Sequence, residues 1–346
     1  MTAGFVDIGL FEATAIGSLP HRDPARACEV VLEALPSVPH WPQLPARDPR
    51  EDMIRQFLEG MPGVGESEDG VYLRPPSEVL EQWEGFLRKV EEGRSEAFSI
   101  SRERAEGLYA FLDRVRGLKP PFLKGQVTGP VTMGFSLKDE GGRAAFYDEE
   151  LREMIVRVLA SKARWQEEVF KEAVPSAETI IFFDEPALAG YGSAYMNVRR
   201  QEVIDALKGA MADLGGLKGI HVCANTDWPM VLEAGFDIVN FDAHGYREEF
   251  LLWTEQIGEF LRRGGIIAWG IVPTDAEALK GSTPSGLAED LRRCLEHLEA
   301  SGVEGEFLRR SLITPSCGTG SLTEAEAEEV YRLLRELRRV LGRSHG

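Results

Sequence analysis

Short apolar runs alternate along this chain with longer segments in which apolar residues recur every three or four positions. Runs rich in Ile, Val and Phe are typical of buried strands, and the longer segments are typical of amphipathic helices. Eight runs have the strand pattern, at residues 12–16, 40–44, 121–126, 179–183, 218–223, 236–241, 264–270 and 310–314. The run at 40–44 is the weakest, because Pro42 interrupts it and proline has no N–H to donate to a neighbouring strand.

Helical patterns separate these runs, at 143–174, 197–214, 246–263, 285–301 and 323–342. The last one opens with Thr323 and Glu326 at the spacing of a capping box. Strand followed by helix, eight times over, predicts an α/β fold of the (β/α)8 TIM barrel type. The stretch 46–118 holds three further helical patterns, so we expect a helical insertion between strands two and three of a single domain, residues 1–346.

Composition narrows the range of functions. The 346 residues are 43% apolar and 28% charged, which is ordinary for a globular protein with a large core. A formal charge of −18 would repel phosphate backbones and anionic lipid, so nucleic acid and membrane surfaces are not expected as partners. The chain shows neither a signal-peptide pattern nor an apolar run of membrane-spanning length, and we expect a cytoplasmic protein.

The four cysteines divide into two kinds by their surroundings. Cys28 and Cys294 recur with apolar residues at helical spacing, so we expect both to be small core residues. Cys223 and Cys317 follow strand patterns and precede loop residues, which is where functional side chains gather in a barrel.

A metal site is indicated at the carboxyl ends of the strands. Residues i and i+2 of a strand point to the same face, so His221 and Cys223 can both face the barrel mouth, where Cys317 would join them. Three N and S donors with one open position are typical of catalytic Zn²⁺, and Asp242 is a possible fourth ligand. Two thiolates make a soft site suited to sulfur, which favours alkyl transfer to a thiol. The competing interpretation is a hydrogen-bonded barrel histidine beside two inert cysteines.

Two carboxylates follow the fourth predicted strand, Asp184 and Glu185. At the barrel mouth they could bind the ammonium group of a substrate. Carboxylates at this kind of boundary also commonly cap the next helix or face solvent, and residue type alone leaves both readings open.

Seven motifs along the chain resemble, in the same order, those of the zinc-dependent catalytic barrel of cobalamin-independent methionine synthase. They are AIGSLP (15–20), DPREDMIRQF (48–57), KGQVTGPVTM (124–133), FFDEPAL (182–188), HVC (221–223), FDIVNFD (236–242) and TPSCG (314–318). The resemblance implies a methyltransferase in which zinc activates the sulfur of homocysteine.

The resemblance also implies roles for particular residues. His221, Cys223 and Cys317 would be zinc ligands and catalytic, with Asp242 in the place of the acidic ligand. Ser18 and Asp184 would hold the amino-acid substrate, and Glu185 adjoins this site.

Several positions depart from the family pattern. Asp242 is one methylene shorter than the usual glutamate, and a histidine expected after strand seven is missing. Arg47 stands where family members have a glutamate for the substrate amine, and arginine would favour a carboxylate. The long members of the family also have an additional N-terminal half, and we expect no counterpart of it within these 346 residues. The methyl donor could therefore be methyl-folate or a methylated corrinoid on a partner protein.

Three other functions remain open at this point. One is a corrinoid-linked methyltransferase for another thiol, and a second is an enzyme similar to uroporphyrinogen decarboxylase, which needs no zinc–thiolate site. The third is a non-catalytic metal-binding barrel, which would have four ligands and no open position.

Overall fold

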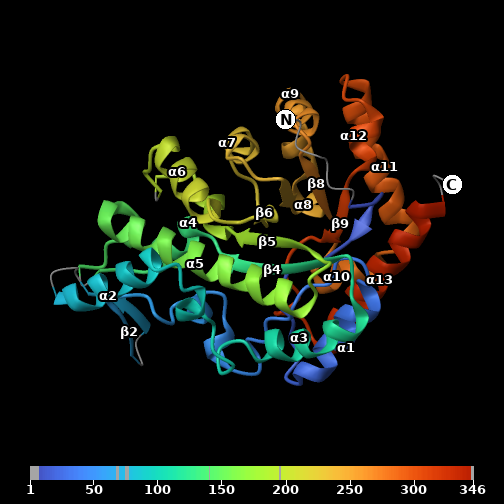
Figure 1. Ribbon diagram of the computed structural model, residues 1–346. Coiled ribbons are helices and arrows are strands. Elements are labelled where there is room, and N and C mark those ends of the chain that lie inside the picture. The colour runs from blue at the N-terminus through green and yellow to red at the C-terminus, as the bar shows by residue number, and fades with distance from the viewer. Residues whose placement is uncertain (1–7, 68–69, 75–77, 140, 195, 344–346) are drawn as a thin grey trace.

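A curled parallel sheet organises the chain (Figure 1). The computed structural model describes residues 8–67, 70–74, 78–139, 141–194 and 196–343, so both ends of the predicted domain lie outside the described residues. Within them the sheet has seven strands in the order β1-β9-β8-β7-β6-β5-β4. The strands are β1 (Glu12–Ala13), β4 (Phe122–Thr128), β5 (Glu178–Asp184), β6 (Leu217–Val222), β7 (Ile238–Phe241), β8 (Ile266–Val272) and β9 (Leu312–Pro315). The α/β class and these predicted strands are confirmed.

The predicted strand at 40–44 does not form as a regular strand. Its residues make only isolated parallel bridges, from Gln43 to Ser18 and from His40 to Lys124 on β4. Prolines at 39 and 42 remove N–H groups that a strand would donate, which explains the loss of a continuous ladder. The bridges nevertheless join the two edges of the sheet, so the seven strands curl into a TIM-like barrel with an irregular eighth position.

The inside of the curled sheet is apolar toward the amino ends of the strands. A buried cluster there consists of Ile8, Val38, Phe122, Ile180, Phe182, Ile238, Ile266, Ala268 and Leu312. Polar inward-facing residues follow on the same strands, such as Gln126 after Phe122 on β4 and Asp184 after Phe182 on β5. Because alternate residues of a strand share a face, the same strands supply both the core and the polar mouth.

Most of the helices cover the outside of the sheet (Figure 1). The helices are α1 (Pro24–Ala34), α2 (Leu80–Glu91), α3 (Glu106–Leu118), α4 (Pro130–Ser136), α5 (Glu149–Ala173), α6 (Arg200–Met211), α7 (Trp228–Glu233), α8 (Ala243–Leu251), α9 (Thr254–Arg262), α10 (Ala276–Gly281), α11 (Pro284–Ala300), α12 (Gly305–Arg309) and α13 (Glu324–Arg343). Helix α2 lies apart from the sheet, beyond α5 (Figure 1). The predicted capping box of α13 is confirmed, since Thr323 N donates to Glu326 Oε2 (3.0 Å) and Glu326 N donates to Thr323 Oγ1 (3.3 Å). The predicted core positions of Cys28 and Cys294 are also confirmed, with exposures of 0% and 2%.

The segment 46–118 is less helical than we expected. Helix α3 packs against both α1 and α5, so it belongs to the outer layer of the barrel (Figure 1). This segment also contains an antiparallel hairpin, β2 (Val64–Ser67) with β3 (Gly70–Leu73). Short 3-10 helices occur in this segment and elsewhere, at η1 (Pro49–Glu51), η2 (Arg55–Phe57), η4 (Ser95–Phe98), η5 (Ala145–Tyr147) and η6 (Pro186–Gly190).

One of the three helical patterns expected within 46–118 lies at residues 50–60, and the structure has η1 and η2 there because polar side chains bind the local backbone. Asp48 Oδ1 accepts from Arg50 N (2.9 Å), and Asp52 Oδ1 accepts from the N–H groups of Ile54 and Arg55 (2.8 Å each). Such local bonds compete with helical ones.

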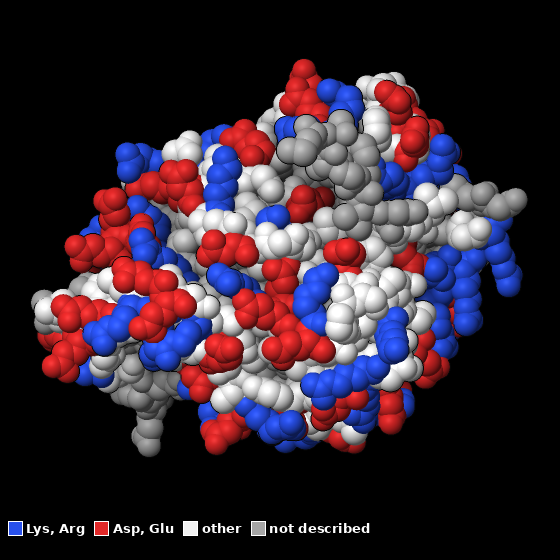
Figure 2. Space-filling view, in the orientation of Figure 1, with Lys and Arg blue, Asp and Glu red and all other residues white. Residues whose placement is uncertain are grey.

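Acidic and basic side chains are interspersed over the face seen in Figure 2. In the part of the chain that the structure describes, no helix is both long enough and apolar enough to cross a membrane.

Candidate metal centre and substrate site

The imidazole of His221 and the thiols of Cys223 and Cys317 come together at the carboxyl ends of β6 and β9. One ligand atom from each lies within 4.8 Å of the others, and this is the one group of its kind found among the described residues. His221 is 3% exposed and both cysteines are partly exposed, so the two sulfurs are accessible to solvent while the imidazole is buried. One nitrogen, two sulfurs and an open side match the donor set of a catalytic zinc ion.

The ring of His221 is held by Asn240 on the neighbouring strand β7. Nδ1 of His221 lies 2.5 Å from Oδ1 of Asn240. Nε2 is buried and has no hydrogen-bond partner within the described residues. A buried nitrogen without a partner beside two sulfurs is what a metal ligand requires. Sequence reasoning missed Asn240, although it alternates with Ile238 and Asp242 and so faces the same side.

The sulfurs of Cys223 and Cys317 are joined by a hydrogen bond that shifts their pKa values in opposite directions. A hydrogen bond with the Cys223 thiol holds the pKa of Cys317 below its usual range, and His221 acts in the same direction. The same hydrogen bond, with burial, raises the pKa of Cys223. Burial alone would lower the pKa of His221, but the Cys317 thiolate and Asp184 outweigh it and raise that pKa. Binding a cation here would therefore release protons.

Asp184 ends β5 directly beside His221. The two residues are paired in the register of β5 and β6. Asp184 is 7% exposed, and its Oδ1 has no hydrogen-bond partner among the residues described. Burial raises the pKa of this carboxyl, while His221 and Lys124 oppose the rise. A buried carboxylate oxygen without a donor can accept a hydrogen bond from a bound cation.

Lys124 is a buried cation beneath Asp184 that sequence reasoning also missed. Its Nζ lies 4.3 Å from the centre of the Phe182 ring and has no hydrogen-bond acceptor in the described part of the chain. Burial lowers the pKa of Lys124 to about 8, and Asp184 opposes this. The ring and the nearby carboxylate are thus the partners that offset the cost of burying this charge.

Ser18 lies against the loop that carries Cys317. Its carbonyl accepts from Thr319 N (2.9 Å), and a Cβ added to Gly318 would lie 2.1 Å from Ser18 Oγ. Only glycine leaves room for the serine hydroxyl at this position. The structure therefore brings Ser18 next to the loop of Cys317, and its role in holding a substrate stays a prediction.

Glu185, for which the sequence left substrate binding and helix capping both open, binds the first residues of helix α4. Oε1 accepts from Val131 N (2.9 Å), and Oε2 accepts from Thr132 N (2.7 Å) and Thr132 Oγ1 (2.6 Å). The carboxylate is fully buried, and burial raises its pKa to about 7 against the effect of these bonds. A Cβ on Gly129 would lie 2.1 Å from the Glu185 carboxyl carbon, so glycine is needed for this approach. Glu185 thus caps α4, which lies more than 50 residues earlier in the chain, and not the next helix, and its role at a substrate stays a prediction.

Asp242 is close to the three donors but is not part of their group. Its Oδ1 accepts from Gly245 N (2.7 Å) and so caps α8. Burial raises its pKa, the Gly245 N–H opposes this, and the Cys317 thiolate adds to the rise. That Asp242 binds the metal stays a prediction. Binding would require its carboxylate to turn away from the N-terminus of α8.

Arg47 forms an ion pair that the sequence did not suggest. Its Nε donates to Oε1 of Glu51 (2.5 Å), and Glu51 is fully buried. Burial raises the pKa of Glu51 to about 7, and Arg47 opposes this rise. Because Glu51 offsets part of its charge, Arg47 attracts a substrate carboxylate less strongly than a free arginine would. Its role in binding stays a prediction.

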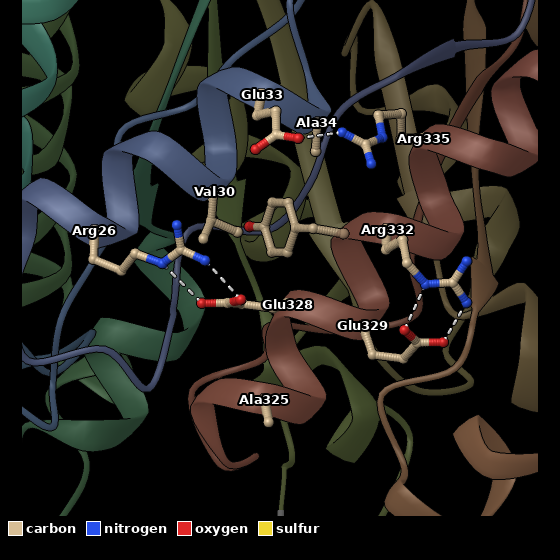
Figure 3. Close-up of a pocket in the computed structure, with 10 residues that line it drawn as sticks. Arg26, Val30, Glu33, Ala34, Ala325, Glu328, Glu329, Arg332 and Arg335 are labelled. Atoms are coloured by element: carbon tan, nitrogen blue, oxygen red, sulfur yellow. Dashed lines mark hydrogen bonds and ion pairs between the residues drawn. The ribbon is translucent and has the colours of Figure 1, made fainter.

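A separate cavity of about 360 Å³ lies outside the barrel between α1 and α13 (Figure 3). Its charged side chains pair with one another: Arg26 with Glu328, Arg335 with Glu33, and Arg332 with Glu329. Each of these charged groups therefore has a partner of opposite charge, although Nε of Arg335 is buried without a hydrogen-bond partner among the described residues.

Comparison with known proteins gives a likeness of fold. No protein-family model matches the sequence, and a search of curated proteins finds no match. A B12-independent methionine synthase from Shewanella sp. W3-18-1, solved with selenomethionine, is similar with a TM-score of 0.63 and 17% identity, over 97% of this chain and 99% of that one.

Two further structures are similar over nearly the whole chain. A methyltransferase from Methanosarcina mazei has a TM-score of 0.55 and 13% identity, over 96% of this chain and 94% of that one. A candidate vitamin-B12-independent methionine synthase from Listeria monocytogenes has a TM-score of 0.54 and 14% identity, over 98% and 99%. The fold thus resembles that of B12-independent methionine synthases, as the sequence motifs predict. A shared fold alone does not fix a function.

Proposed function

We propose that this protein is a zinc-dependent methyltransferase that transfers a methyl group to the sulfur of a thiol, with homocysteine as the acceptor. The observation that carries the proposal is the group formed by His221, Cys223 and Cys317 at the carboxyl ends of barrel strands. The likeness to methionine synthases and a methyltransferase supports it.

His221, Cys223 and Cys317 would hold the metal in this proposal. Zinc bound there would lower the pKa of an acceptor thiol, while two anionic sulfur ligands keep that sulfur electron-rich. The thiolate sulfur then forms a bond to the methyl carbon as the bond between methyl and donor breaks, and that electron pair stays with the donor.

Other residues of the mouth would position the acceptor. Asp184 supplies a buried carboxylate for the ammonium group of homocysteine, next to the metal-binding imidazole. Ser18 supplies a hydroxyl beside Gly318 for a second polar contact. Both act by orientation, because a correctly placed sulfur needs less reorganisation to react.

The methyl donor is either methyl-folate or a methylated corrinoid on a partner protein, and both belong in the test. A corrinoid donor with another thiol is the nearest alternative. A non-catalytic metal-binding barrel predicts a fourth protein ligand, whereas the described group contains three. A decarboxylase similar to uroporphyrinogen decarboxylase would be favoured if the protein bound no metal. The cytoplasmic location and the lack of a nucleic-acid partner stay predictions.

The proposal is tested by methyl transfer to homocysteine with methyl-tetrahydrofolate and methylcobalamin assayed side by side. Transfer should occur with one of them, stop when zinc is removed by a chelator, and return when zinc is restored. Cys223→Ser should abolish it, and Cys294→Ser, which changes a buried thiol in α11, should not. Transfer that persists without zinc would contradict the proposal. A zinc-bound protein that transfers from neither donor would favour the metal-binding barrel.

A further inference from the structure

We propose that Asn240 is a positioning residue of the metal centre: it holds the His221 ring so that Nδ1 carries the hydrogen and Nε2 remains the donor atom for the metal. This inference rests on the proposed zinc centre and adds to it a residue outside the ligand set. Asn240 is fully buried in β7, between Val239 and Phe241.

The orientation of the Asn240 amide is fixed by its other contacts. Nδ2 donates to the Ala268 carbonyl (2.8 Å) and to Thr314 Oγ1 (2.8 Å). The Ala268 oxygen can only accept, and the Thr314 hydroxyl uses its own hydrogen on the carbonyl of Pro315 (2.9 Å). Rotating the amide by half a turn would set two acceptors against each other at Ala268. Oδ1 therefore faces His221.

This orientation decides which nitrogen of His221 holds the hydrogen. An amide oxygen can only accept, so Nδ1, 2.5 Å away, must donate to it. Any proton that His221 loses when a metal binds then comes from Nε2, the buried nitrogen without a partner in the described chain. Hydrogen bonds of this kind to a metal-binding histidine fix both the tautomer and the angle of the ring.

The same amide connects the strands that carry the ligands. It links His221 on β6, its own strand β7, Ala268 on β8 and Thr314 on β9. Thr314 lies three positions before Cys317 on the chain. Asn240 thereby ties the strand of the nitrogen ligand to the strand that leads to a sulfur ligand.

Zinc affinity of three variants, measured by competition with a chelator, tests this role. Asn240→Leu keeps the number and branching of the side-chain heavy atoms but removes the acceptor, and it should weaken zinc binding by about 10- to 100-fold. Gln166→Leu is the matched control. Gln166 is a fully buried amide on α5 that accepts from Trp41 Nε1 (2.9 Å) and donates to the Gln126 carbonyl (3.0 Å). It should lower stability but leave zinc affinity unchanged.

Asn240→Asp distinguishes the bond that Oδ1 accepts from His221 from the bonds that Nδ2 donates to Ala268 and Thr314. Aspartate keeps an oxygen opposite Nδ1 but cannot donate to Ala268 or Thr314, so zinc affinity should stay near that of the wild type while the free energy of unfolding falls. If this variant loses as much zinc affinity as Asn240→Leu, the amide acts by supporting the strands and the proposal is wrong. The proposal is also wrong if Asn240→Leu binds zinc like the wild type.

The tautomer of His221 can be measured in protein without metal, so the role of Asn240 can be tested even if the proposed function is wrong. Nitrogen-15 NMR of labelled histidine side chains in the metal-free wild type, at a pH where His221 is neutral, should show the hydrogen on Nδ1. A hydrogen found on Nε2 would overturn the inference. Because this measurement uses the wild type, it holds even if a variant fails to fold. A wild type that bound no zinc would defeat the proposed function and leave this tautomer result to decide the role of Asn240.

Discussion

Asp184 and His221 occupy directly paired positions on the neighbouring parallel strands β5 and β6. This places a buried carboxylate beside the imidazole of the candidate metal centre. Oδ1 of Asp184 finds no hydrogen-bond donor in the described residues, and Lys124 lies close enough to oppose the effect of burial on the pKa of the carboxyl. The pairing therefore sets a group able to bind a cation next to a group able to bind a metal.

Replacing Asp184 by asparagine should weaken acceptor binding. The variant keeps the shape of the side chain but loses the charge that would bind an ammonium group. A hydrogen bond to a charged group contributes about 1.5–3 kcal/mol, so kcat/KM for homocysteine should fall by roughly 10- to 100-fold, mainly through KM. Steady-state kinetics measure this. Asp205→Asn, a change on the exposed side of α6, is the control, and an unaltered KM in Asp184→Asn would remove Asp184 from the substrate site.

Replacing Gly318 by alanine should disturb the proposed acceptor site at Ser18. The new Cβ would lie 2.1 Å from Ser18 Oγ, so either the hydroxyl must rotate away or the loop with Cys317 must shift. Because displacements of about 1 Å can cost up to 100-fold in rate, we expect Gly318→Ala to lower kcat/KM by about tenfold or more. Gly342→Ala, where an added Cβ meets nothing within 4 Å, is the matched control. Equal kinetics for the two variants would show that the position of Ser18 is unimportant.

Glu185 should make the stability of the protein depend on pH. Its pKa rises from 4.5 to about 7 on folding, so between these values the native state binds more protons than the unfolded state. Its contribution to stability is therefore fully present below about pH 4.5 and is lost as the pH rises through about 7.

Urea unfolding at pH 5 and pH 8 tests this dependence on Glu185. The difference in unfolding free energy between the two pH values should be smaller in Glu185→Gln than in the wild type, because glutamine does not titrate. Glu178→Gln, at the exposed start of β5, should keep the wild-type difference. An unchanged difference in Glu185→Gln would mean that Glu185 does not titrate in this range.

The sequence predicts local features of this fold well where one strong pattern acts alone. The capping box of α13 depends on Thr323 and Glu326, three residues apart, and it forms as predicted. His221 and Cys223 share a face because of strand geometry, and Cys317 joins them because all carboxyl ends of a parallel barrel meet at one side.

Features that depend on distant partners could not be read in the same way. The role of Glu185 is set by the N–H groups of Val131 and Thr132, more than 50 residues away. Arg47 pairs with Glu51 only four residues further along the chain, but the burial of Glu51 depends on how the whole segment packs. Asn240 would have required knowing which strands flank β7, since its partners lie on three other strands.

The central claim is that His221, Cys223 and Cys317 form one zinc site, and zinc content after dialysis against a weak chelator tests it most directly. Elemental analysis should find about one zinc ion per chain in the wild type and in Cys294→Ser. Cys317→Ser should lose most of the metal while remaining folded by circular dichroism. A wild type without zinc, or a Cys317→Ser variant that holds zinc as tightly as the wild type, would contradict the account.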